Sequence, residues 1–153
     1  MTFEIESYPD QIDSLISKYP VVFKNLDTTM FHSLPAGWYG IMDNLCKELT
    51  VLLEEELKAT PEDPEMPLFI VYQLKEKFGG LRFYYHMNTA NDSLHSKVQS
   101  LVDIAEDMSY EICQVTGNPG VVCRKGNWYM TLCEESRKSM GYEAIDSGHK
   151  KSH

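Results

Sequence analysis

The sequence predicts an α+β domain in which two long helices pack on a short antiparallel β-hairpin or sheet. Apolar residues recur at spacings of three and four over residues 36–59 and again over roughly 92–115. This is the period of an α-helix with one buried face. Between these segments, two β-rich runs flank a Gly-Gly pair at 79–80, which is typical of a β-hairpin.

Length and composition predict one folded domain. The chain has 153 residues, of which 42% are hydrophobic and 11% aromatic. We expect a single domain over 1–140 and a polar, flexible tail over 141–153. The acidic first residues do not resemble a signal peptide, and no apolar run approaches the roughly 18 residues of a membrane span. We therefore expect a cytoplasmic protein without membrane contact, whose four cysteines are reduced thiols.

The chain before the hairpin is predicted to be mainly helical. A short amphipathic helix is expected at 9–19, followed by an irregular segment over 20–35 that prolines bound. The first long helix, 36–59, ends in an acidic, proline-rich loop over 60–67. Cys46 lies beside the apolar stripe of this helix and is expected to be a small buried residue.

The hairpin is predicted to turn at Gly79-Gly80, because both central residues of a type I′ turn need positive φ. In that register Lys77 lies opposite Arg82. Side chains alternate between the two faces of a strand, so one face is nearly apolar and packs on the helices. The other face is expected to display cations and aromatic rings on an acidic protein: Lys75, Lys77, Arg82, Tyr84 and His86.

Two interpretations of this polar face remain open. It is either a solvated outer surface or a binding surface for a small anionic ligand or an acidic protein partner. Lys77 opposite Arg82 is a like-charge pair that costs up to about 1 kcal/mol unless an anion offsets it. Glu76 falls on the apolar face in this register and needs a buried partner. A longer turn would change the register and mix the two faces.

Acidic residues are concentrated in one segment. The formal net charge is −9, and residues 43–65 carry many of the acids, including Glu54, Glu55 and Glu56. This segment is either a solvated helix face that continues into a charged loop or a docking surface for a basic partner. The net charge argues against general nucleic-acid binding, which needs a surplus of Lys and Arg.

Two short motifs near the end of the chain have the spacing of zinc knuckles: Cys113 with Thr116, and Cys133 with Ser136. Structural zinc needs four thiolate or imidazole ligands, and neutral hydroxyls are poor substitutes. The sequence therefore predicts a vestigial, zinc-ribbon-like knuckle without a metal. We expect it to close by packing of three apolar residues on the second long helix: Trp128, Leu132 and Met140.

A retained zinc is the alternative for this knuckle. Cys123 lies between the two motifs and could supply a third thiolate beside Cys113 and Cys133. His149 or water would then be the fourth ligand. Because this set needs irregular ligand spacing, no cofactor is expected.

Three sequence blocks resemble an uncharacterised family of small cytoplasmic proteins common in phages and prophages. The blocks are Gly37-Trp38-Tyr39 at a helix start, the run Lys-Glu-Lys-Phe-Gly-Gly-Leu-Arg-Phe-Tyr over 75–84, and the Cys113/Cys133 frame. The resemblance implies that typical members have a Cys at the position of Thr116 and a His or Cys at the position of Ser136. These residues would complete a zinc-ribbon-like knuckle. The family has no settled activity, so the resemblance implies origin and fold rather than function.

Catalysis has little support in the sequence. His86 and His95 lack a nucleophile or carboxylate that the sequence pairs with them, and Gly79-Gly80 does not open a helix as a phosphate loop would. We expect a non-enzymatic protein-binding module of phage or prophage type, which inhibits or sequesters a host or defence-system protein through segment 43–65 or the hairpin face. The alternative is a small-molecule binder or enzyme that uses the basic hairpin face for a phosphate or nucleotide.

Overall fold

The computed structural model describes residues 7–145, and side chains from residue 11 onward. The α+β class is confirmed, with helices and antiparallel sheets over this range. The helices are α1 (Ser7–Lys18), α2 (Pro20–Phe23), α3 (Tyr39–Ala59), α4 (Asp92–Met108) and α5 (Glu134–Met140), with short 3-10 helices η1 (Ala36–Trp38) and η2 (Ser109–Glu111). The strands are β1 (Phe69–Lys77), β2 (Gly80–Met87), β3 (Val121–Lys125), β4 (Trp128–Leu132) and β5 (Glu143–Ala144).

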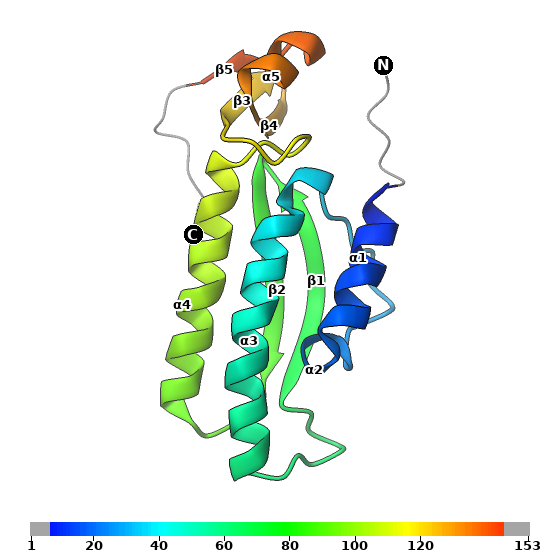
Figure 1. Ribbon diagram of the computed structural model, residues 1–153, viewed down its shortest axis with the longest axis vertical. Helices are drawn as coiled ribbons and strands as arrows, with labels where there is room; N and C mark the ends of the chain where they lie inside the picture. The colour runs from blue at the N-terminus through cyan, green and yellow to red at the C-terminus, as the bar shows by residue number, and fades with distance from the viewer. Residues whose placement is uncertain (1–6, 146–153) are drawn as a thin grey trace.

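The two long helices cover one face of the hairpin. Figure 1 shows α3 and α4 side by side in front of β1 and β2, with α1 and α2 beside β1. A small sheet with the order β4–β3–β5, together with α5, sits at one end of these long elements. We call residues 113–145 the C-terminal unit and residues 11–112 the body.

The body has a large apolar core, as the helical periodicity predicts. Met42, Leu49 and Leu53 on α3 are at most 1% exposed. Cys46 is fully buried beside them, so its prediction as a small core residue is confirmed. The α4 stripe is buried likewise, and the helix starts at Asn91, whose side chain accepts a hydrogen bond from the Leu94 backbone N–H.

The predicted pairing of the hairpin is wrong: the turn lies one residue earlier, which moves each pairing partner by two residues and leaves the same side chains on each face. The turn is at Phe78-Gly79, both with positive φ (53° and 87°), and Lys77 pairs with Gly80. Arg82 therefore lies opposite Lys75, so the predicted Lys77–Arg82 pair does not exist. The reason is Tyr110: a Cβ at residue 80 would lie 2.3 Å from its Cζ. Glycine at 80 is needed inside the strand, which moves the turn one residue back.

The chain beyond α5 differs from the expected flexible tail. Gly141 ends the helix in the left-handed conformation (φ 77°), and Glu143–Ala144 then pairs with β3. Ile145 continues this contact, because its N–H donates to the Val122 carbonyl oxygen. Residues 146–153, which include His149, lie outside the described residues.

Candidate functional site

The candidate site lies on the hairpin face opposite to α3 and α4, which we call the outer face. It carries Lys75, Lys77, Tyr84 and His86, as the sequence predicts, because these residues share one strand face in the observed register too. The apolar inner face packs into the core, with Leu74, Leu81 and Phe83 at most 2% exposed.

The outer face presents aromatic rings with a cation placed over one of them. Tyr84 is 40% exposed, and the Lys75 Nζ lies 5.7 Å from its ring centroid, a cation–π contact. Tyr72 is 42% exposed, and its ring centroid is 6.4 Å from that of His86. Strand alternation alone would place Tyr72 on the inner face, together with Leu74 and Glu76. A bulge between Val71 and Gln73 explains the difference, since it inserts one residue and changes the alternation.

Arg82 does not belong to the displayed cations. It is 9% exposed, and its Nη1 donates to the Leu81 carbonyl oxygen (3.2 Å) and to the Tyr110 hydroxyl (3.1 Å). Tyr110 therefore covers the end of the outer face nearest the turn and holds the guanidinium inside the protein. The prediction of Arg82 as a displayed cation is therefore wrong. Tyr110, which buries the guanidinium, is 28 positions away in the sequence, so the strand pattern alone does not reveal it.

Glu76 has the partner that its position requires. Its Oε2 accepts the Gly79 backbone N–H at 2.6 Å, which closes the turn. Burial raises the pKa of Glu76, although the Gly79 N–H and the charge of Arg82 oppose the shift. This carboxylate stabilises the turn and is not available to a ligand on the outer face.

The edge of β2 that does not pair with β1 donates its backbone N–H groups to two side chains that the sequence patterns did not single out. The Leu81 N–H donates to Ser109 Oγ and the Phe83 N–H donates to Glu106 Oε2, both at 2.8 Å. Glu106 and Ser109 are buried. Their signal in the sequence was a pair of polar residues three apart at the end of an apolar helical stripe, which places both on one side of the helix.

The acidic segment contains several carboxylates that make internal contacts. Glu56 accepts hydrogen bonds from Thr89 Oγ1 (3.1 Å) and Asn91 Nδ2 (2.9 Å), so it fixes the loop before α4. Glu62 pairs with Lys24 and accepts the Leu68 N–H. Glu54 and Glu55 are exposed on α3. Fewer carboxylates of this segment are therefore available to a basic partner than the sequence suggests.

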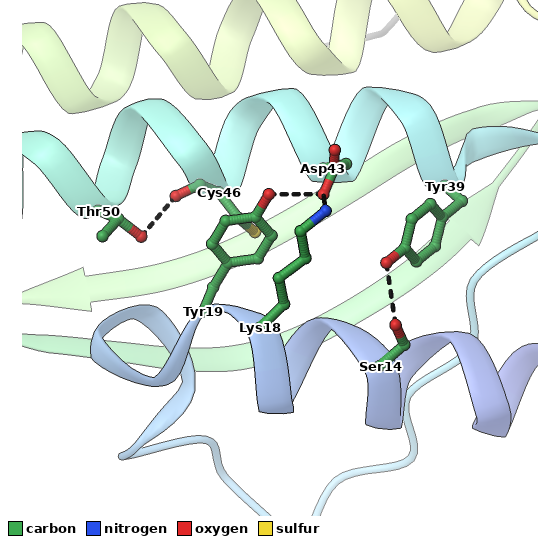
Figure 2. A network of polar contacts seen from close by, with 7 residues as sticks. All are labelled: Ser14, Lys18, Tyr19, Tyr39, Asp43, Cys46 and Thr50. Atoms are coloured by element: carbon green, nitrogen blue, oxygen red, sulfur yellow. Dashed lines mark hydrogen bonds and ion pairs between the residues drawn. The ribbon is translucent and has the colours of Figure 1, made fainter.

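Asp43, at the start of the acidic segment, joins α1 to α3. Figure 2 shows its carboxylate facing Lys18 and Tyr19, and Oδ1 accepts hydrogen bonds from Lys18 Nζ (2.8 Å) and Tyr19 Oη (2.5 Å). The bonds from Lys18 and then Tyr19 lower the pKa of Asp43. Ser14 and Tyr39 make a second contact between the same helices, 3.0 Å between their hydroxyl oxygens.

The four knuckle positions come together in the C-terminal unit. Ser136 Oγ lies 3.8 Å from Cys113 Sγ and 3.3 Å from Cys133 Sγ. Thr116 contacts both sulfurs, through its N–H to Cys113 Sγ (3.4 Å) and its Oγ1 to Cys133 Sγ (3.8 Å). Two thiols and two neutral hydroxyls do not fit a structural zinc. Among the side chains that the structure describes, residues 11–145, no three of His, Cys, Asp or Glu gather as a metal site would need.

The packing of this unit follows the prediction in part. Leu132 is fully buried with Cys113 and Cys123, and Met140 packs against them. Trp128 is 74% exposed, so its predicted burial is wrong. It pairs with Lys125 at the open tip of the β3–β4 hairpin.

The chain was compared with protein-family models, curated proteins and solved structures, and none of them matches it. Among the helices of the described range, none combines the length and the apolar composition that a membrane span requires. The outer face and the cysteine frame are therefore the features of the molecule from which a function can be inferred.

Proposed function

We propose that this protein is a non-enzymatic protein-binding module and that the outer face of the β1–β2 hairpin is its contact surface. The observation that carries this proposal is the pair of exposed tyrosines, Tyr72 and Tyr84, on a sheet face with Lys75 held over one ring. Large rings exposed on a rigid sheet are costly to leave in water and are favoured at the centres of protein interfaces.

The charge of the outer face indicates the chemistry of the partner. Lys75 and Lys77 lie on a chain whose formal net charge is −9. An acidic surface or peptide would be attracted to this face and repelled by most of the remaining surface, which favours one binding orientation. The partner is therefore expected to present carboxylates beside an apolar surface that covers the tyrosine rings.

The resemblance to phage and prophage proteins supports a partner in the host cytoplasm. Under this proposal the protein occupies a host or defence-system protein and blocks its normal contacts. The phosphate or nucleotide alternative has weaker support, because Arg82 is buried and the groove beside it is also lined by Asp103 and Glu106. Carboxylates at that position disfavour an anionic ligand.

Affinity capture from bacterial lysate tests the proposal with two surface variants. Tyr72→Ala/Tyr84→Ala removes the rings, and Lys75→Glu/Lys77→Glu reverses the charge. Loss of an interface anchor costs about 2 kcal/mol, so each variant is expected to weaken capture of the wild-type partner roughly thirtyfold. Binding constants measured by titration with the captured partner would give the size of the effect.

The matched control is Glu54→Lys/Glu55→Lys, which changes the charge of α3 on the other side of the hairpin. It should leave capture unchanged. A partner that is lost with this control but kept by both hairpin variants would assign the contact to the acidic segment. No specific capture by the wild-type protein would contradict a binding module.

A further inference from the structure

Two of the four cysteines differ from the others in their polar contacts. Cys46 and Cys123 are buried, and burial raises the pKa of both thiols. Cys113 and Cys133 instead share a polar cluster with Thr116 and Ser136. Cys113 is fully buried in this cluster, whereas Cys133 is partly exposed. The pair of Cys113 and Cys133 therefore combines access from solvent at Cys133 with polar contacts to both sulfurs.

The geometry holds the two sulfurs of this pair together. Each sulfur contacts Ser136 Oγ, at 3.8 and 3.3 Å, and each contacts Thr116. The backbone N–H of Cys133 also acts on the Cys113 sulfur, so this sulfur lies against the backbone of the other cysteine. A disulfide requires two cysteines whose Cα and Cβ atoms lie close together, and the shared contacts place these two cysteines side by side.

We propose that Cys113 and Cys133 form a reversible intramolecular disulfide when the protein reacts with a low-molecular-weight disulfide. This reaction is independent of partner binding at the outer face.

The order of the two exchange steps follows from exposure. The Cys133 thiolate attacks one sulfur of the oxidant, which forms a mixed disulfide and releases the first small thiol. The buried Cys113 thiolate then attacks Cys133 Sγ and releases the second small thiol. In total, two protein thiols lose two electrons and two protons, and the oxidant disulfide is reduced to two thiols.

The surroundings of Cys113 suit its part in the second step. Burial opposes its thiolate, but the Thr116 hydroxyl and the backbone N–H groups of Cys133, Thr116 and Val115 outweigh burial and lower the pKa of Cys113 to about 7. A substantial fraction is therefore thiolate at neutral pH, and the thiolate is the attacking species. The attack needs no access to solvent, because its target is a neighbouring sulfur.

The test incubates the full chain with oxidised glutathione, blocks the remaining thiols by alkylation in acid, and maps the peptides by mass spectrometry. We expect a Cys113–Cys133 disulfide that excess reduced glutathione reverses. The variants Cys46→Ser and Cys123→Ser should form it to the same extent. Four alkylated thiols in the oxidised wild-type protein, or a disulfide that involves Cys123 or a second chain, would overturn the proposal.

The single serine variants test the order of steps. Cys113→Ser should keep a stable glutathione adduct on Cys133, because the resolving thiol is gone. Cys133→Ser should give at least tenfold less adduct on the buried Cys113. Equal adducts on both variants would contradict the assignment of Cys133 as the entry thiol. The wild-type peptide map remains decisive if one of these variants fails to fold.

Discussion

The body and the C-terminal unit are stabilised in different ways. The body buries apolar residues from α1 to α4 and both long strands in one continuous core. In the C-terminal unit the buried apolar cluster centres on Cys113, Cys123 and Leu132. Val115, Met130, Met140 and Tyr142 pack against this small cluster, and polar contacts around the cysteine frame and hydrogen bonds to the body supplement it. Periodic apolar burial can thus build one region, while a neighbouring region depends on a few specific contacts.

Several contacts between the two regions use backbone groups, beside an edge-to-face contact of the Phe78 and Tyr129 rings. The Gly37 N–H donates to the Gln114 carbonyl oxygen at 2.8 Å, and Thr131 Oγ1 donates to the Gly79 carbonyl oxygen at 2.7 Å. The Trp38 indole donates to the Ile112 carbonyl oxygen at 2.9 Å, just before the unit begins. The C-terminal unit is therefore positioned by close backbone approach, which leaves little room for added atoms.

The largest expected effect comes from completing the cysteine frame. Thr116→Cys/Ser136→Cys would place four thiols where two thiols and two hydroxyls now meet. We expect this variant to bind one zinc ion per chain, with about 4 kcal/mol of added stability at a zinc concentration 1,000-fold above Kd. Metal analysis and thermal unfolding with and without zinc measure both quantities.

The control adds the same number of thiols elsewhere. Ser93→Cys/Ser139→Cys changes exposed positions at the start of α4 and on α5. It should bind zinc no better than the wild-type protein. If the completed frame also fails to gain affinity, the four positions do not form a tetrahedral set, and the description as a vestigial zinc knuckle is wrong.

The next largest effect is expected at the junction of the two regions. In Gly37→Ala, the new Cβ would lie 2.0 Å from the Cys113 carbonyl oxygen and 2.7 Å from the Gly117 backbone nitrogen. Backbone atoms cannot move away as a side-chain tip can, so we expect a loss of about 3 kcal/mol in the free energy of unfolding. Urea unfolding followed by circular dichroism measures this change.

Gly40→Ala is the matched control, since its Cβ would meet nothing within 4 Å. Residue 40 is exposed in the first turn of α3, where alanine favours the helix by up to about 1 kcal/mol. The two substitutions are therefore expected to have opposite signs. Equal effects would mean that the junction tolerates expansion and that the two regions are less tightly joined than the structure indicates.

Sequence reasoning succeeded where the structural cause is local. The period of apolar residues in α3 and α4 fixes which helix face is buried, and the β-rich runs fix the existence of the hairpin. The positions of the cysteine motifs also identified four side chains that meet in the structure. Each of these features depends on residues close together in the sequence or on a fixed spacing.

The sequence-based predictions failed where a residue distant in the sequence decides the local structure. Gly79-Gly80 and Phe78-Gly79 are both possible turns, and Tyr110 selects the second because its ring occupies the space above Gly80. The same tyrosine buries Arg82, which the strand pattern alone places among the displayed cations. Trp128 was expected to pack on the second long helix, but its position at a hairpin tip leaves it exposed.

The smallest expected effect is at the edge of the body, where α1 meets α3 through Asp43. Hydrogen bonds from Lys18 and then Tyr19 lower the pKa of this carboxyl in the folded protein. Its contribution is therefore fully present above the unfolded pKa of about 3.9 and is lost as pH falls through the lower folded value. Asp43→Asn should lower the free energy of unfolding by roughly 1 kcal/mol at pH 7 and by progressively less below about pH 4.

Asp13→Asn, at an exposed position on α1, is the control and should change stability little at either pH. Since apolar burial dominates the body, urea unfolding of Asp43→Asn should remain a single transition. A separate early transition of α1 in this variant would show instead that the polar contact, and not the apolar core, attaches α1 to the body.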